Sequence, residues 1–232
     1  MAVDARVIDS GGVVKSRHGE RFNHDDDASF YDVQVRREGN PIRSGYGAVL
    51  RWVAEYSNAL SGRVLELGSG TGNLTALLDS ERPILCVDLS ERMFEIAREK
   101  LAGRAGGIGY VREDLLGFFD NCDDVFGVIV STYAVHHLEE DEKQRLFEAI
   151  RGVLQPGGVA IFGDLMFASE RARREFVLEC RGGERAWLAD EVEDEYFWLV
   201  DRAVSALEEL GFEVRTEQFS ELSWGVRAEL RL

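Results

Sequence analysis

Three glycines and one carboxylate are spaced as a nucleoside-binding site requires. Gly68, Gly70 and Gly72 lie in a turn directly after the apolar run 64–67. Glycine adopts backbone angles that few other residues tolerate, and because it has no Cβ a ligand can lie against the main chain. Backbone amides at the start of the following helix would face that ligand. Asp88 ends the next apolar run, and we expect it to accept hydrogen bonds from ribose hydroxyls.

Two side chains beside the glycines indicate which nucleoside fits. A dinucleotide-binding turn has glycine at its first, third and sixth positions, and here the sixth position is Asn73. Glu66 places negative charge directly before the turn, where it would repel a diphosphate. A positively charged ligand with one ribose and no phosphate suits these residues better. S-adenosylmethionine, a sulfonium that also carries an ammonium group, fits that description.

Alternating apolar runs and amphipathic stretches indicate the elements that carry these residues, a pattern typical of a parallel sheet covered by helices on both faces. We expect strands over 64–67, 84–89, 108–111, 125–131 and 159–162, and helices over 41–56, 73–78, 91–101, 139–154, 170–181 and 189–210. Ser90 is placed to cap the helix that follows it. Residues 212–219 and 224–232 predict a hairpin. The prediction is an α/β fold with a seven-stranded, mostly parallel sheet and an antiparallel C-terminal hairpin.

Composition limits the partners and the location of the protein. The chain has 232 residues, and 43 acidic against 27 basic side chains give a formal charge of -16, which repels nucleic acid and anionic membranes. No apolar run approaches the roughly 20 residues of a membrane helix. Asp4, Arg6 and Asp9 interrupt the N-terminus, so we expect no secretory signal there. We therefore predict a cytoplasmic protein that binds neither nucleic acid nor membranes.

Five segments in order resemble motifs of the class I S-adenosylmethionine-dependent methyltransferases. They cover residues 66–72, 87–93, 113–114, 131–138 and 154–158. The resemblance extends from about Asp25 to the end of the chain and implies a Rossmann-like fold. It also implies one methyltransferase domain over 1–232, with an N-terminal cap over 1–58, a cofactor-binding core over 63–165 and substrate-side helices with the hairpin over 166–232. Residues 131–143 and 196–224 are similar to a bacterial group of small, mostly uncharacterised methyltransferases.

The resemblance also implies roles for individual residues around the cofactor. Asp88 takes both ribose hydroxyls, and Leu89 and Met93 pack on the adenine. Asp114 accepts a hydrogen bond from the adenine amine, and the Leu115 amide donates one to the ring. The complete set of cofactor-binding residues that we expect is Tyr31, Glu66, Gly68, Ser69, Gly70, Asn73, Asp88, Leu89, Met93, Asp114, Leu115 and Ser131.

Three of these residues are expected at the methionine end of the cofactor. Glu66 lies beneath the methionine moiety, and backbone at Ser131 holds its ammonium group. Tyr31 closes over the cofactor and shields the sulfonium by a cation–π contact.

Methyl transfer requires few catalytic side chains. The cofactor supplies the electrophile, so the protein must chiefly align the two reactants and exclude water. We expect no metal, since the sequence has no His-x-x-x-His pair and its three cysteines are widely spaced. A base would help an acceptor that must lose a proton, and His136, His137 and Tyr133 are the candidates, with Asp164 as a further pocket residue. Each of these side chains is equally compatible with a packing role, so the catalytic residue stays open.

The sequence therefore predicts a methyltransferase that acts on an unidentified small-molecule acceptor by in-line displacement driven by proximity. The alternative is a protein that binds S-adenosylmethionine or S-adenosylhomocysteine without transferase activity. A nicotinamide-dependent dehydrogenase is disfavoured by Asn73 and by the C-terminal hairpin. The expected assembly is a monomer or a homodimer.

Overall fold

The computed structural model describes residues 7–9, 15–22, 25, 28–37 and 39–232. Asp4 and Arg6, which led us to expect no secretory signal, lie outside the described residues. The strands are β1 (Val7–Asp9), β2 (Val64–Leu67), β3 (Ile84–Asp88), β4 (Ile108–Arg112), β5 (Phe126–Thr132), β6 (Leu154–Phe167), β7 (Trp198–Leu199), β8 (Phe212–Gln218) and β9 (Ser223–Leu230). The α-helices are α1 (Ala28–Gln34), α2 (Tyr46–Asn58), α3 (Glu91–Lys100), α4 (Glu140–Val153), α5 (Glu170–Arg181), α6 (Ala186–Asp194) and α7 (Val200–Glu209).

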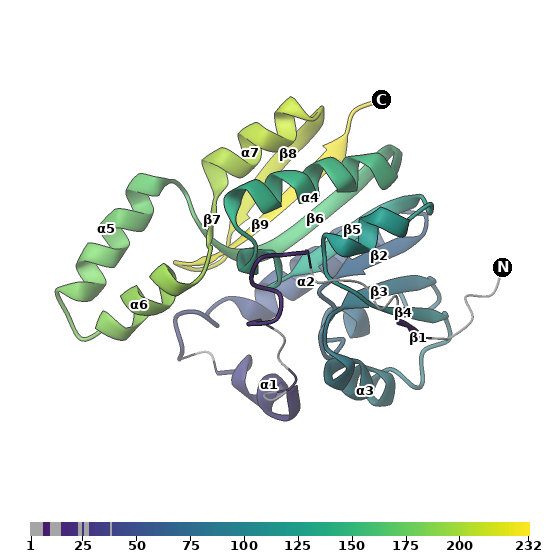
Figure 1. Cartoon of the computed structure of the whole chain (residues 1–232), viewed down its shortest axis with the longest axis horizontal. Coiled ribbons are helices and arrows are strands. Elements are labelled where there is room, and N and C mark those ends of the chain that lie inside the picture. Colours follow the sequence, from purple (N-terminus) through teal and green to yellow (C-terminus); the bar gives the residue numbers. More distant parts are fainter. Residues whose placement is uncertain (1–6, 10–14, 23–24, 26–27, 38) are drawn as a thin grey trace.

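The strands form one mixed sheet at the centre of the molecule (Figure 1). Their order is β1-β4-β3-β2-β5-β6-β9-β8, and β7 pairs with the end of β6. β9 runs antiparallel to both β6 and β8, whereas all other pairs are parallel. The predicted parallel sheet with a C-terminal hairpin is confirmed, and the short strands β1 and β7 are additions that the sequence pattern did not indicate.

Alternating side chains on each central strand form two hydrophobic cores, one on each face of the sheet. Val64 of β2 belongs to the core that contains the buried side of α2 and α3. Its neighbour Leu65 belongs to the core that contains α4 and α7. Successive strand residues point to opposite faces, which explains why these strands are apolar throughout. Helices on both faces of the sheet are therefore confirmed.

Three expected helices differ from the observed elements because tertiary contacts override the local pattern. The helix over 73–78 is only a 3-10 turn, η1 (Thr75–Leu77), since Arg104 donates to the carbonyl oxygens of Thr75 and Leu78, both at 3.0 Å. The helix expected over 41–56 begins five residues later. Gly45 has a left-handed φ of 84° and ends the preceding turn, so α2 begins at Tyr46.

The single helix expected over 189–210 is broken into α6 and α7. Between them, Trp198 is fully buried against Phe147 of α4 and Phe162 of β6, with ring centroids 5.5 and 5.2 Å apart. Lys143 donates to the carbonyl oxygen of Tyr196 at 2.6 Å, which places this segment against α4. Burial of the indole in strand geometry therefore outweighs the helical spacing of the sequence.

The helix after β3 begins as expected. Ser90 Oγ accepts a hydrogen bond from the Met93 amide at 3.0 Å, which confirms the predicted cap. Within the described part of the chain, no helix is long and apolar enough to cross a membrane.

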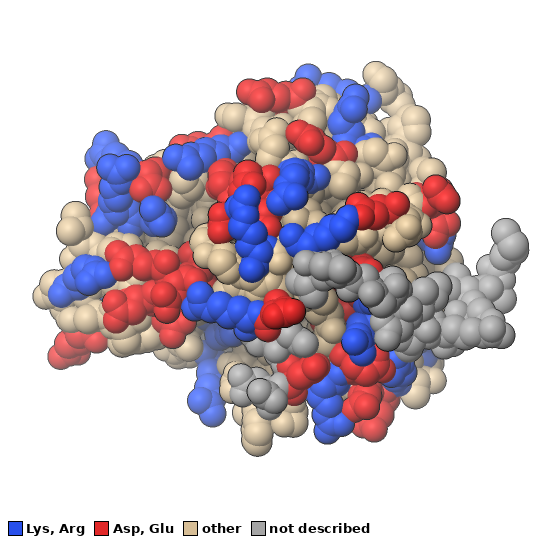
Figure 2. Space-filling model, in the orientation of Figure 1, with Lys and Arg blue, Asp and Glu red and all other residues tan. Residues whose placement is uncertain are grey.

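Surface charges of both signs alternate on the face shown in Figure 2. The basic helix α5 is an example: Glu170 accepts from Arg173 at 3.0 Å and from Arg174 at 2.9 Å. These cations are balanced locally, so α5 does not present a surface of one sign to an anionic partner.

Candidate functional site

The turn after β2 is held in place by β3. The amides of Gly68 and Ser69 both donate to the Val87 carbonyl oxygen, at 2.8 and 3.2 Å. Gly68 has a φ of 68°, and a Cβ added there would lie 2.3 Å from the Cβ of Ala134. Glycine is therefore required at position 68, both for its backbone angle and for the close approach of Ala134.

Asp88 stands at the end of β3 with both carboxylate oxygens fixed by backbone amides. Gly70 donates to Oδ2 at 2.7 Å and Ser90 donates to Oδ1 at 2.9 Å. Burial raises the pKa of Asp88 from its usual value, although these amide hydrogen bonds lower it. Each oxygen keeps further acceptor capacity, so the carboxylate is oriented to receive two hydroxyl groups.

Asp114 follows β4 and binds the N-terminal segment of residues 15–22, here called the strap. Its carboxylate accepts from the Leu116 amide at 2.9 Å and the Gly117 amide at 3.1 Å. Ser16 of the strap also donates to it, from its amide at 3.2 Å and from its hydroxyl. The resemblance assigned Asp114 to the adenine amine, so an adenine bound there must share this carboxylate with Ser16 or displace it.

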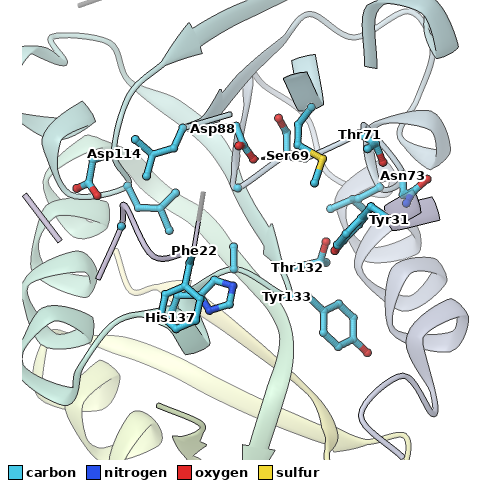
Figure 3. Close-up of a pocket in the computed structure, with 18 of the residues that line it drawn as sticks. Phe22, Tyr31, Ser69, Thr71, Asn73, Asp88, Asp114, Thr132, Tyr133 and His137 are labelled. Atoms are coloured by element: carbon cyan, nitrogen blue, oxygen red, sulfur yellow. Dashed lines mark hydrogen bonds between the residues drawn. The ribbon is translucent and has the colours of Figure 1, made fainter. Parts of the chain in front are cut away.

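A cavity of about 860 Å³, including its open mouth, lies between these strand ends, the strap and α1. Figure 3 shows Asp114, Asp88 and Ser69 along one side of it, Tyr31 and Asn73 at one end, and Thr132 and Tyr133 along another side. The structure brings most of the expected residues to its wall. These are Tyr31, Gly68, Ser69, Gly70, Asn73, Asp88, Leu89, Met93, Asp114, Leu115, Tyr133 and His137.

Glu66 and Ser131 are buried and lie outside the cavity wall. Glu66 accepts a hydrogen bond from the Thr75 hydroxyl at 2.7 Å, and burial raises its pKa to about 7. The Ser131 hydroxyl donates to the Leu67 carbonyl oxygen at 2.8 Å. Both side chains therefore bond to neighbouring backbone or side-chain groups beneath the cavity wall and stabilise the ends of β2 and β5.

Helix α1 is attached to the glycine turn through Asp32. Its carboxylate accepts from Thr71 at 2.6 Å and Asn73 at 2.9 Å, and it pairs with Lys100 of α3 at 2.7 Å. Burial alone would raise the pKa of Asp32, but the hydrogen bonds from Lys100, Thr71 and Asn73 outweigh burial and lower it. The ionised carboxylate fixes α1, and with it Tyr31, beside the turn.

Tyr133 at the end of β5 has a strained backbone. It has a φ of 51°, which costs a non-glycine residue roughly 1 to 3 kcal/mol. Its amide donates to the Gly163 carbonyl oxygen at 2.9 Å, and its hydroxyl bonds to Ser223 at 3.1 Å. Burial raises the pKa of Tyr133 well above its usual value. A phenol that stays protonated is a hydrogen-bond donor and a poor base, which weakens Tyr133 as a candidate general base.

The two adjacent histidines occupy different environments. His137 lines the cavity, and its ring stacks on Phe22 of the strap with centroids 4.0 Å apart. His136 is buried behind the wall, where its Nδ1 lies 2.5 Å from Oδ1 of Asp164. The other oxygen of Asp164 accepts the amides of Val135 and His136 at 3.0 and 3.1 Å. Of the candidate bases, the cavity therefore includes His137 and Tyr133 but not His136.

Several wall residues were not predicted from the sequence. Ser16 and Phe22 come from the strap, Tyr46 from α2, and Thr132 from β5. The ring of Tyr46 lies 4.9 Å from that of Tyr133, and its hydroxyl accepts from Asn73 at 3.1 Å. Tyr46 lies in no sequence motif that would have indicated its position in the wall. Thr132, between two residues already considered, could have been found from its position at the end of β5.

Comparison with known sequences agrees with this arrangement. The family described as "Methyltransferase domain" matches residues 64–158. An uncharacterized methyltransferase of Oceanobacillus iheyensis is 33% identical over 208 residues, which cover 89% of this chain and 92% of that protein. One of Geobacillus kaustophilus is 33% identical over 207 residues, with 89% and 91% covered.

Solved structures share the fold at lower sequence identity. Magnesium protoporphyrin IX methyltransferase of Synechocystis PCC 6803, crystallised with SAH, has a TM-score of 0.65 at 18% identity over 91% of this chain and 97% of that one. The DhpI-SAM-HEP complex has a TM-score of 0.66 at 22% identity, with 91% and 96% covered. Together with the motifs and the arrangement of the strand ends, these relatives establish that the chain belongs to the class I S-adenosylmethionine-dependent methyltransferases.

Proposed function

We propose that the protein methylates a small-molecule acceptor inside the cavity between the strand ends, the strap and α1. The observation that carries this proposal is that the chain covers its own cavity. Ser16 and Phe22 of the strap and Tyr31 of α1 all contribute to the wall. A cavity covered in this way favours a small acceptor over a macromolecular one.

The residues of the wall suit the cofactor of the family. Asp88 offers an oriented carboxylate for the ribose. Gly68 allows the turn to lie against Ala134, because a side chain at position 68 would clash with it. Leu89 and Met93 supply apolar surface for the adenine ring. Glu66 and Ser131 are proposed to act indirectly, by holding the strands and the turn from behind.

Bound S-adenosylmethionine supplies an electrophilic methyl group on a sulfonium, which the acceptor takes by in-line displacement. The residues of this chain orient the two reactants and exclude water. Tyr31 and Tyr46 have pKa values raised by burial, so both rings remain neutral. Neutral aromatic rings beside a sulfonium favour it by cation–π attraction.

The same proposal includes the partners and the location of the protein. A formal charge of -16 repels nucleic acid phosphates and acidic membrane surfaces, which favours a diffusible acceptor. We propose a cytoplasmic enzyme that acts as a monomer or a homodimer and transfers a methyl group to a metabolite.

Calorimetry with S-adenosylhomocysteine tests the cofactor site. Wild type should bind it, and Asp88→Ala should weaken binding by roughly 1 to 3 kcal/mol because two hydroxyls lose an ionised partner. Asp79→Ala is the matched control, since Asp79 is a turn residue outside the cavity wall whose carboxylate accepts the local Glu81 amide at 3.0 Å. Equal affinities for wild type and Asp88→Ala would refute the placement of the ribose.

A labelled methyl group tests the class of acceptor. The enzyme is incubated with S-adenosylmethionine labelled in the methyl group and with a bacterial extract divided by ultrafiltration into small and large molecules. Label transferred to the small-molecule fraction supports the proposal. Label transferred only to protein or nucleic acid contradicts it.

A further inference from the structure

A group of polar side chains that includes His137 lies at the edge of the cavity. It consists of His136, His137 and Glu195; each offers one ligand atom, and these three atoms lie within 4.8 Å of one another. We propose that these three residues bind one divalent transition-metal ion of the zinc type. Two imidazoles and one carboxylate, with a remaining position for another ligand, are the donor set of many catalytic zinc sites. We expected no metal because the sequence has no His-x-x-x-His pair and its three cysteines are widely spaced; Glu195 lies 59 positions from His136, so local spacing does not reveal this group.

The contacts of His136 leave one ring nitrogen facing Glu195. Oδ1 of Asp164 lies 2.5 Å from Nδ1 of His136, so Nε2 is the ring nitrogen that remains for a metal ion. Nε2 lies 3.4 Å from Oε2 of Glu195. Two acceptor atoms that face each other repel unless a cation lies between them. A metal ion bound between Nε2 and Oε2 would satisfy both acceptor atoms.

The spacing of the donor atoms favours the metal. Two ligand atoms that each lie about 2.0 to 2.1 Å from a tetrahedral zinc ion are separated by about 3.3 Å. The observed 3.4 Å between His136 Nε2 and Glu195 Oε2 is close to that value. A proton shared between nitrogen and oxygen would bring them to about 2.7 to 2.9 Å. Rotation of the His137 side chain would bring in the third donor.

The surroundings hold the two parts of this site in place before any ion binds. The Tyr196 amide donates to the His136 carbonyl oxygen at 3.0 Å, so the residue after Glu195 is fixed to the residue that would share the metal with it. Lys143 joins both segments by donating to the carbonyl oxygens of Leu138 and Tyr196. Asp164, fixed by its backbone hydrogen bonds, orients His136 as a carboxylate behind a metal-binding histidine does.

Such an ion would act on the acceptor, because His137 also lines the cavity. A metal lowers the pKa of a hydroxyl or thiol that it binds. The acceptor proton would leave to water, and the freed lone pair would form the bond to the methyl carbon as the bond from that carbon to sulfur breaks. The site thus favours an acceptor with an oxygen or sulfur nucleophile, and it would replace a general base.

Metal binding can be measured without knowledge of the acceptor. Protein without a polyhistidine tag is stripped with a chelator and titrated with Co²⁺ while visible absorption is followed, and Zn²⁺ binding is measured by calorimetry. Wild type should bind one ion per chain, develop the absorption bands of Co²⁺ with nitrogen and oxygen ligands, and gain thermal stability with Zn²⁺.

The test variant is Glu195→Gln, which keeps the size of the side chain at a position that is 22% exposed. We expect its Zn²⁺ affinity to fall by about tenfold or more and its Co²⁺ spectrum to weaken. The matched control is Glu191→Gln on the same chain segment, one turn earlier and outside the group, which should bind the ions as wild type does. S-adenosylhomocysteine affinity should be the same in all three proteins, so a failure of the cofactor site would be recognised separately.

Two results would overturn the proposal. Wild-type protein that shows neither a Co²⁺ spectrum nor Zn²⁺ heat would mean that His136, His137 and Glu195 bind no metal ion. Unchanged metal binding in Glu195→Gln would mean that the ions bind elsewhere on the chain.

Discussion

The two sides of the cavity are built in different ways. The side proposed for the cofactor is made from short segments at the ends of β2, β3 and β4. Backbone amides orient its two carboxylates. The amides of Gly70 and Ser90 donate to Asp88, and those of Leu116 and Gly117 donate to Asp114. The other side, which we propose for the acceptor, is made from side chains of the strap, α1, α2 and the end of β5. A site built from backbone within short segments leaves a motif in the sequence, whereas a site assembled from distant side chains does not.

Gly68→Ala should break the cofactor side most severely. The new Cβ would lie 2.3 Å from the Cβ of Ala134 at a residue whose φ is 68°, so the turn must move. We expect calorimetry to detect no S-adenosylhomocysteine binding and unfolding to show a loss of roughly 1 to 3 kcal/mol. Gly103→Ala is the matched control, since among the described residues no atom beyond its two chain neighbours would lie within 4 Å of its new Cβ. Wild-type affinity in Gly68→Ala would show that the turn does not contact the cofactor.

Glu66→Gln examines a motif residue that lies behind the cofactor side. The folded pKa of Glu66 is about 7, above the ordinary value of 4.5, so the folded state binds its proton more tightly than the unfolded state. The cost of ionisation is absent below pH 4.5, grows as the pH rises, and is complete above about 7. Glutamine cannot ionise, so the variant should gain up to about 3 kcal/mol at pH 8 and much less at pH 5.

Urea unfolding at the two pH values measures this gain. If the variant instead lost S-adenosylhomocysteine affinity with no change in stability, Glu66 would contact the methionine moiety directly, as the family resemblance implied.

Gly68 and Glu66 show which parts of the site can be predicted from the sequence. The glycine turn, Asp88 and Asp114 were predicted because their roles depend on neighbours within a few residues. The direction of the Glu66 side chain was not, since it depends on Thr75 and on packing beneath the turn. The contact of Tyr46 with Tyr133 joins residues 87 positions apart, and the pairing of His136 with Glu195 spans 59, so no local spacing could indicate either.

The elements of the fold follow the same division. The central strands and α4 were predicted well because burial on both faces and an acidic first turn are local signals. The break between α6 and α7 was missed because it depends on the contacts of Trp198 with α4 and β6.

Asp32→Asn tests the connection between the two sides. The variant weakens the ion pair with Lys100 and the hydrogen bonds from Thr71 and Asn73 that hold α1 to the turn. We expect S-adenosylhomocysteine affinity to fall by about 1 kcal/mol, or about fivefold, with little loss of stability. Because the pKa of Asp32 is lowered, its carboxylate is ionised around neutral pH, and its titration should not change wild-type affinity there. An unchanged affinity in calorimetry would mean that α1 does not contribute to cofactor binding.

Tyr133→Phe should have the smallest effect on cofactor binding. It removes the hydroxyl that bonds to Ser223 at 3.1 Å and keeps the ring. The expected cost in unfolding free energy is about 0.5 to 1.5 kcal/mol, with unchanged S-adenosylhomocysteine affinity. A large loss of methyl transfer at unchanged stability would show that the hydroxyl acts on the acceptor.

A crystal structure with S-adenosylhomocysteine tests the proposed position of the cofactor at the ends of β2 and β3. We expect both ribose hydroxyls on the carboxylate of Asp88, the adenine ring against Leu89 and Met93, and the sulfur facing the space beside Tyr31. A ligand bound elsewhere, or one that leaves Asp88 without a ribose contact, would contradict the account.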